Sequence, residues 1–235
     1  MIPLRDMNPA RSRPVATYAF IAINVIVFLY QFSLGELHGQ EFVERFGVVP
    51  VELVYGDHPG SWITPLTSMF LHGGWLHIIG NMWFLHIFGD NVEDNLGKVR
   101  YALFYVLCGL AAVGAQVLID PTSEMPMVGA SGAIAGVLGG YVTLHPRARV
   151  LTLVPIFIFI QFVELPAFFF IFVWFGYQLL MGFTSLGAAA SQGGVAFFAH
   201  IGGFLAGLAL IHVFRRRGNP TDGFRPPLRV AREWR

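Results

Sequence analysis

The stretch MVGASGAIAGVLGG, residues 127–140, places five glycines and a single hydroxyl, that of Ser131, at the start of an apolar run. A glycine inside a helix costs about 1 kcal/mol relative to alanine. A hydroxyl buried in hydrocarbon needs a hydrogen-bond partner. Both features therefore require a reason, and the rest of the sequence indicates whether they lie in water or in a membrane.

The composition is that of a polytopic membrane protein. Of the 235 residues, 55% are apolar and only 12% are charged, whereas soluble domains carry about 25% charged residues. Several apolar stretches approach the roughly 20 residues that a helix needs to cross a hydrocarbon core. The sequence thus predicts an all-α membrane protein with six transmembrane helices, at residues 15–33, 66–88, 101–119, 129–144, 166–183 and 195–214.

The distribution of positive charge orients these spans. Fourteen of the 15 Lys and Arg residues lie in the N-terminal segment, the second and fourth connections and the C-terminal tail, and Arg45 is the exception. Cytoplasmic connections carry an excess of Lys and Arg, so both termini are predicted to be cytoplasmic. The predicted organisation is a cytoplasmic segment 1–14, a six-span domain 15–214 and a basic cytoplasmic tail 215–235.

A further apolar segment, residues 150–165, is not counted as a span. It is short, is interrupted by Pro155 and ends at Glu164 and Pro166, which a membrane helix would not favour. A seventh span would also move the seven arginines of the tail to the outside. We expect an interfacial or re-entrant stretch on the cytoplasmic side.

Three of the spans carry polar residues at one depth. The second, fourth and sixth spans run from outside to inside, and toward their outer ends they contain His77 and Asn81, Ser131, and His200 respectively. Ionisable residues within spans are costly and mark functional sites. His77 and Asn81, four residues apart, project from one helix face. Hydrogen bonds between helices are the structural alternative, but the shared depth favours one site near the outer surface.

The glycines form stripes of small residues. On the fourth and sixth spans they recur every four residues, at Gly132, Gly136, Gly140, Gly203 and Gly207. Small residues at this spacing let helix backbones approach closely, so the fourth span is expected to pack on the sixth. Packing explains the glycines, but not the Ser and the His at the outer ends of the two stripes.

Closely packed helices allow the short hydrogen bond, about 2.6–3.2 Å, that joins a nucleophile to its base. We expect Ser131 to be the nucleophile and His200 the base that returns the proton to the leaving amine. Gly129 lets the chain turn sharply into a helix with unpaired backbone N–H groups. The Ser131 N–H and the side chains of His77 and Asn81 are then placed to hold an oxyanion. No carboxylate lies at that depth, so the predicted machinery is a dyad.

These motifs resemble those of the rhomboid family of intramembrane serine proteases. The resemblance rests on HGGWLHIIGN (72–81), GASG (129–132) and AHIGGFLAG (199–207), and it extends from the first span to the sixth. It implies Ser131 and His200 as the catalytic dyad and His77 and Asn81 as oxyanion contributors. It also implies that Gly129 and Gly132 set the backbone geometry, and that the fifth span borders a lateral opening for the substrate helix.

The sequence therefore predicts a serine endopeptidase that cuts single-span membrane proteins in or near their transmembrane segment. No metal, other cofactor or nucleic-acid partner is expected, and the sequence does not indicate an oligomeric state. The compact build and basic tail favour a bacterial inner membrane, with the active site opening to the extracytoplasmic side. An organelle membrane is the alternative location.

Two positions depart from the family's pattern, and three other functions compete. No Trp–Arg pair occurs between residues 34 and 60, and Ala135 stands where a tyrosine would stack on the histidine. A catalytically inactive rhomboid-like binder of transmembrane helices would keep the same fold. A transporter or channel would be expected to show an inverted repeat, and a membrane metalloprotease an H-E-x-x-H motif. No inverted repeat is apparent, and no glutamate lies between His72 and His77.

Overall fold

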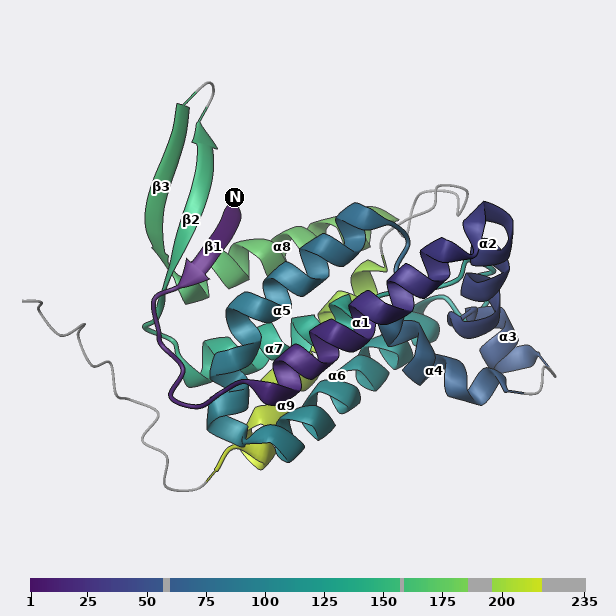
Figure 1. Cartoon of the computed structure of the whole chain (residues 1–235), viewed down its shortest axis with the longest axis horizontal. Coiled ribbons are helices and arrows are strands. Elements are labelled where there is room, and N and C mark those ends of the chain that lie inside the picture. The colour runs from purple at the N-terminus through teal and green to yellow at the C-terminus, as the bar shows by residue number, and fades with distance from the viewer. Residues whose placement is uncertain (57–59, 157–158, 186–195, 217–235) are drawn as a thin grey trace, which may run out of the picture.

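The computed structural model describes residues 1–56, 60–156, 159–185 and 196–216 (Figure 1). Long helices lie side by side: α1 (Val15–Ser33), α5 (Trp75–Leu96), α6 (Lys98–Ile119), α7 (Ser131–Leu144), α8 (Ala167–Ser185) and α9 (Phe197–Phe214). Shorter elements fill the connection between α1 and α5: α2 (Gly35–Phe46), α3 (Pro50–Tyr55), α4 (Thr64–Thr67) and 3₁₀ turns at Ser61–Ile63 and Ser68–Phe70.

Each predicted span overlaps one of the long helices, and the helical part of the fold prediction is confirmed. The second differs most, because α5 begins at Trp75 and continues to Leu96. Among the described residues, four helices are long and apolar enough to cross a membrane: α1, α6, α9 and Ala167–Thr184 of α8. The chain is therefore a helical membrane protein.

A three-stranded sheet, which the all-α prediction missed, stands beside the helices (Figure 1). The strands β1 (Ile2–Asp6), β2 (Arg149–Ile156) and β3 (Phe159–Pro166) pair in the order β1-β2-β3, and both pairings are antiparallel. The segment 150–165 is thus a hairpin in which Val150 pairs with Leu165. Its β-branched and aromatic residues favour strands, and the N-terminal segment supplies the third strand.

Helix α7 is the centre of the bundle. Every residue of α7 except Ser131 and Thr143 is buried. A β-carbon on Gly203 of α9 would overlap the carbonyl oxygen of Gly132, and one on Gly207 would overlap that of Gly136. The α7 and α9 backbones are therefore in direct contact.

One glycine of the predicted stripe, Gly140, does not lie against the α9 backbone. A β-carbon on Gly140 would meet side chains, those of Phe104 and Ile211, at 3.1 and 3.2 Å. The next close approach to the α9 backbone is made by Gly139, where a β-carbon would overlap the carbonyl oxygen of Phe204. The four-residue repeat thus shifts by one position along α7, because neighbouring turns of two crossing helices do not stay in register.

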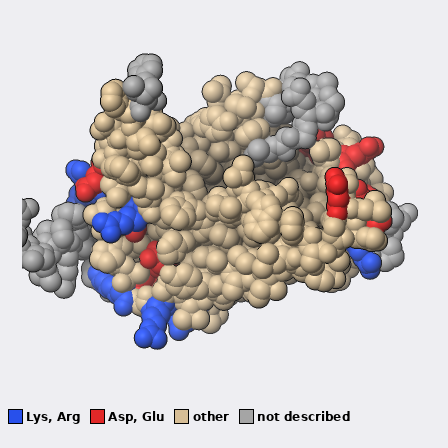
Figure 2. All heavy atoms as spheres, turned by 45° about the horizontal axis from the view of Figure 1, so that its top comes forward, with Lys and Arg blue, Asp and Glu red and all other residues tan. Residues whose placement is uncertain are grey.

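Charged groups gather at the two ends of the molecule. On the face that Figure 2 shows, most of the Lys and Arg lie at the end that carries the sheet, Asp and Glu lie at both ends, and a broad region without charge covers the middle. Glu93 near the end of α5 is buried, and its carboxylate accepts hydrogen bonds from the Ala16 and Thr17 N–H groups at 2.9 and 2.8 Å. A carboxylate at this position satisfies the free N–H groups of the first turn of α1 and complements the helix dipole.

The strand β1 is held to the helices by a buried polar cluster. The Asp6 carboxylate accepts hydrogen bonds from Asn91 Nδ2 at 2.7 Å and from the Tyr141 hydroxyl at 2.8 Å. Burial raises the pKa of Asp6 from 3.8 to about 7, although the Tyr141 hydrogen bond opposes this shift; the nearby Asp90 adds to it. Asp6 therefore changes its charge near neutral pH.

We expect Gly207→Ala to lower the thermal unfolding midpoint in detergent micelles, because the added methyl overlaps the backbone of α7. Overpacking of this kind costs about 1–3 kcal/mol. Gly176→Ala is the matched control, since a β-carbon at Gly176 on α8 has nothing within 4 Å. Equal midpoints for the two variants would show that α7 and α9 can separate without cost.

Asp6 makes the stability of the fold depend on pH. With the folded-state pKa raised, the folded chain retains a proton that the unfolded chain has released, so its contribution is lost as pH rises through about 7. The unfolding midpoint is expected to fall as the pH rises from about 4 to about 7 and to level off above that, with a smaller fall in Asp6→Asn. An identical slope in parent and variant would contradict this assignment.

Candidate active site

The backbone before α7 turns sharply against α5. Gly129 has a φ of +126°, which L side chains rarely adopt, and a β-carbon there would lie 2.8 Å from His77 Cε1 and Nε2. Its N–H donates to the Ser68 carbonyl at 2.9 Å, and Met127 pairs with Val48 from the connection after α1. Glycine is therefore required both for the backbone conformation and for the approach to His77.

The first residue of α7 and the first turn of α9 meet at this turn. The half-buried Ser131 lies with its Oγ 2.7 Å from Nε2 of His200, whose exposed fraction is 8%. The direct backbone contact of the two helices makes this short distance possible. The distance is the one expected between a nucleophile and its general base.

A third helix reaches the same histidine. Nδ1 of His200 lies 2.8 Å from Oε1 of Gln178 on α8, which is 5% exposed. The ring of Trp174, one turn earlier on α8, lies 6.0 Å from the His200 ring between centroids. Sequence reasoning missed Gln178, although an amide within the apolar run WFGYQLL (174–180) was a signal for it.

Helix α5 brings two further polar side chains to the turn. His77 Nδ1 accepts a hydrogen bond from the Gly73 N–H at 3.3 Å. The Asn81 amide nitrogen is buried and has no partner among the described residues. It lies 3.5 Å from where a Gly129 β-carbon would be. The site therefore contains an unused donor beside Gly129, two residues before Ser131, which an oxygen atom bound there could engage.

All four predicted polar residues, Ser131, His200, His77 and Asn81, thus lie around one turn of the backbone. His72 lies behind them, fully buried, with its ring centroid 5.1 Å from that of His77. Within the described parts of the chain, no group of three or more His, Cys, Asp or Glu side chains is placed to hold a metal ion.

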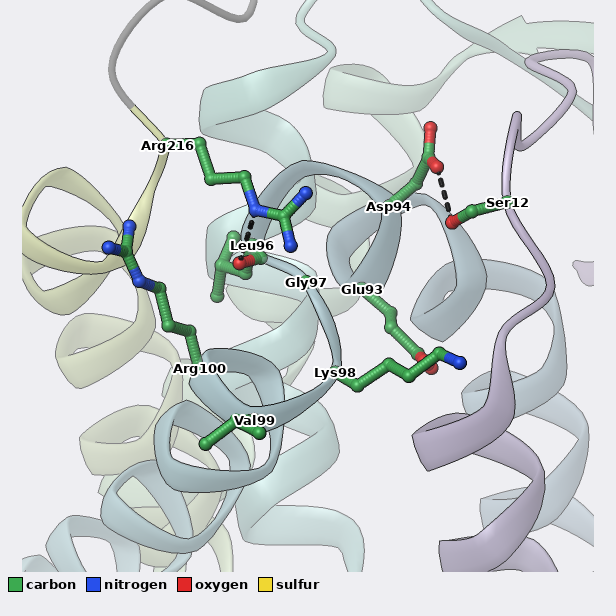
Figure 3. Close-up of a pocket in the computed structure, with 9 residues that line it drawn as sticks. All are labelled: Ser12, Glu93, Asp94, Leu96, Gly97, Lys98, Val99, Arg100 and Arg216. Carbon is green, nitrogen blue, oxygen red and sulfur yellow. Dashed lines mark hydrogen bonds between the residues drawn. The ribbon is translucent and has the colours of Figure 1, made fainter.

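A surface hollow at the opposite end of α5 has a different character (Figure 3). Arg216 donates from Nε to the Leu96 carbonyl at 3.1 Å, and the Ser12 hydroxyl donates to Asp94 at 2.6 Å. These contacts tie the segments before α1 and after α9 to the last turn of α5. The hollow contains none of the residues around Ser131.

Gly129→Ala is expected to slow the reaction of Ser131 with a fluorophosphonate probe. The methyl group would displace the turn from His77, and a misplacement of about 1 Å costs roughly 10²-fold in rate. Gly60→Ala is the matched control, because Gly60 also has a positive φ, +101°, but open space around a β-carbon. Equal labelling rates in the two variants would show that the contact with His77 does not position Ser131.

Comparison with known proteins shows similarity to the rhomboid family along most of the chain. The family described as Rhomboid domain matches residues 59–217. Over 137 residues the chain is 34% identical to Rhomboid protease GluP of Bacillus subtilis, covering 57% of this chain and 26% of that protein. Over 196 residues it is 27% identical to Rhomboid protein 1, mitochondrial, of Saccharomyces cerevisiae, covering 81% of this chain and 51% of that protein.

A relative named as inactive also matches. Over 88 residues the chain is 33% identical to Inactive rhomboid protein 1 of Drosophila melanogaster, covering 37% of this chain and 6% of that protein. The chain spans about half of the yeast relative and smaller fractions of the other two.

Proposed function

The chain belongs to the rhomboid family, and from that premise we propose that it is an intramembrane serine protease. It hydrolyses peptide bonds in or near the transmembrane segment of single-span membrane proteins. The observation that carries this proposal is the 2.7 Å contact between Ser131 Oγ and His200 Nε2. Both groups lie within the part of the chain that the family matches.

The chemistry follows from the arrangement of the four polar residues. His200 Nε2 takes the proton of the Ser131 hydroxyl as Oγ attacks the substrate carbonyl carbon. The carbonyl oxygen becomes an oxyanion, which the Ser131 N–H, the free Asn81 amide and His77 stabilise. His200 then gives the proton to the leaving amine, and a water molecule hydrolyses the acyl-enzyme by the same steps.

The proposed topology has six spans, formed by α1, α5, α6, α7, α8 and α9. Helix α7, with 14 residues, is about 21 Å long and falls short of the roughly 30 Å hydrocarbon thickness. It need not meet lipid, because the other helices surround it. If α7 ends at the cytoplasmic side, Ser131 lies below the outer surface, within reach of water from outside.

The distribution of charge supports the proposed orientation. The carboxylates of α5 lie near its C-terminal end, where Glu93 caps α1, and most of the cations on the face in Figure 2 lie at that same end. That end is cytoplasmic by the positive-inside rule, as are residues 1–14 and the tail 215–235. Residues 217–235 of that tail lie outside the described part of the chain. A bacterial inner membrane is the proposed location.

The alternative function is a binder of transmembrane helices without catalysis. The similarity to the Drosophila relative named inactive favours it, and the fold is the same in both cases. Only the reactivity of Ser131 distinguishes the two functions.

The test reconstitutes the protein in liposomes with a panel of labelled single-span substrates and, in parallel, a fluorophosphonate probe. Ser131→Ala is expected to abolish cleavage and labelling, and His200→Ala to reduce both by about 10²–10⁴-fold, the contribution of a general base. A chelator in the buffer should leave both reactions unchanged.

Matched controls are Ser33→Ala and His38→Ala, because both residues are exposed and lie outside the site. They should cleave and label like the parent. Intact substrate that co-purifies with the parent, together with absent labelling of Ser131, would contradict the protease and support the binder.

A further inference from the structure

The base of the proposed dyad is contacted from a helix that carries neither reacting group. Ser131 lies on α7 and His200 on α9, while the second ring nitrogen of His200 faces Gln178 on α8. We propose that Gln178 is the positioning residue of this site, which fixes the tautomer and ring orientation of His200. The inference rests on the proposed function and identifies the third member that the sequence left unassigned.

The hydrogen-bond chemistry allows one productive arrangement. To accept the Ser131 proton, Nε2 must carry a lone pair, so Nδ1 must carry the hydrogen of the neutral ring. The Gln178 Oε1 at 2.8 Å is an acceptor, and it stabilises that tautomer. If the amide nitrogen faced Nδ1 instead, the hydrogen would be placed on Nε2, which could not deprotonate Ser131.

Burial keeps water from taking the place of the Gln178 amide oxygen. Gln178 is 5% exposed and His200 is 8% exposed, so bulk water does not readily replace the amide oxygen. A buried Nδ1–H without an acceptor would carry the full desolvation cost. The ring would be expected to rotate or to change tautomer to avoid it, and either change removes the contact with Ser131.

Helix α8 also supplies the aromatic side chain that lies beside the His200 ring. The position on α7 that could stack on the histidine is Ala135, which has no ring to offer. Trp174, four residues before Gln178 and therefore on the same face of α8, lies 6.0 Å from His200 between ring centroids. The Nδ1 partner and the aromatic neighbour of the His200 ring thus both come from α8.

The position of α8 is therefore linked to the reactivity of the base. Phe175 of α8 stacks on Phe204 of α9 at 4.4 Å between centroids, and this contact holds α8 against α9. Phe172 and Leu180 on α8 are more than half exposed, as expected for a helix at the edge of the bundle (Figure 1). A displacement of α8 away from α9 would move Gln178 Oε1 away from His200 Nδ1. His200 is therefore oriented only while α8 is packed against α9.

The test compares Gln178→Met, which keeps the length but removes the acceptor, with Gln178→Glu, which restores an acceptor. We expect Gln178→Met to lower the rate of fluorophosphonate labelling and kcat by about 10- to 100-fold, the effect of one buried hydrogen bond, with KM unchanged. Gln178→Glu should recover most of the rate. Its carboxylate would stabilise protonated His200, so the acidic limb of the pH–rate profile should move to higher pH.

Thr184→Val is the matched control on the same helix. Among the described residues its hydroxyl bonds only to the Met181 carbonyl, at 3.0 Å, so its loss should leave the rate and pH profile unchanged. A Gln178→Met variant that labels like Thr184→Val at every pH would overturn the positioning role. So would a Gln178→Glu variant that stays as slow as Gln178→Met and keeps the pH profile of the parent.

The tautomer can also be measured without any activity. Nitrogen-15 NMR of labelled histidine should show the Nδ1–H form of His200 in the parent and a mixture or the Nε2–H form in Gln178→Met. An unchanged tautomer overturns this inference even if the parent is an active protease. A parent that fails to label while Gln178→Met alters the tautomer would overturn the proposed function alone.

Discussion

The direct contact between the backbones of α7 and α9 is the constraint on which the site depends. A side chain at Gly203 or Gly207 would overlap carbonyl oxygens of α7, so the two helices touch without intervening side chains. Within a bilayer the gain from such contact comes from van der Waals packing, because lipid is as apolar as the helix surfaces. The close approach brings Ser131 and His200 to 2.7 Å.

Polar groups inside this bundle are paired from one helix to another. Glu93 of α5 holds the first turn of α1 at one end, and Gln178 of α8 holds His200 of α9 near the other. Each unpaired polar group would be costly away from water, so these bonds restrict how the helices can be arranged. The Asn81 amide nitrogen is among the buried polar atoms that have no partner in the described residues, and it lies where the proposed oxyanion would form.

Much of the fold could be predicted because the bilayer imposes simple rules on sequence. The lengths of the apolar stretches located the long helices, and polar residues toward the same ends of three spans indicated Ser131 and the three polar residues around it. The asymmetry of Lys and Arg predicts the orientation of these helices. The sheet was missed because the apolar segment 150–165 was assigned to the membrane interface, and because β1 lies far from the hairpin β2–β3 in the sequence. Gln178 was missed for a related reason, since one amide in an apolar run does not indicate which helix it faces.

The sequence by itself determined a helical membrane protein, its glycine stripes, and a Ser and a His at matching depth. Periodicity and hydropathy are local properties, so they can be read along one chain. Only the tertiary structure decided that Gly139 replaces Gly140 at the contact with the α9 backbone, and that α8 supplies the amide and the aromatic ring beside His200. These outcomes depend on how the packed helices cross and how each is rotated about its axis. Both are determined by contacts between helices and not by the local sequence of any one helix.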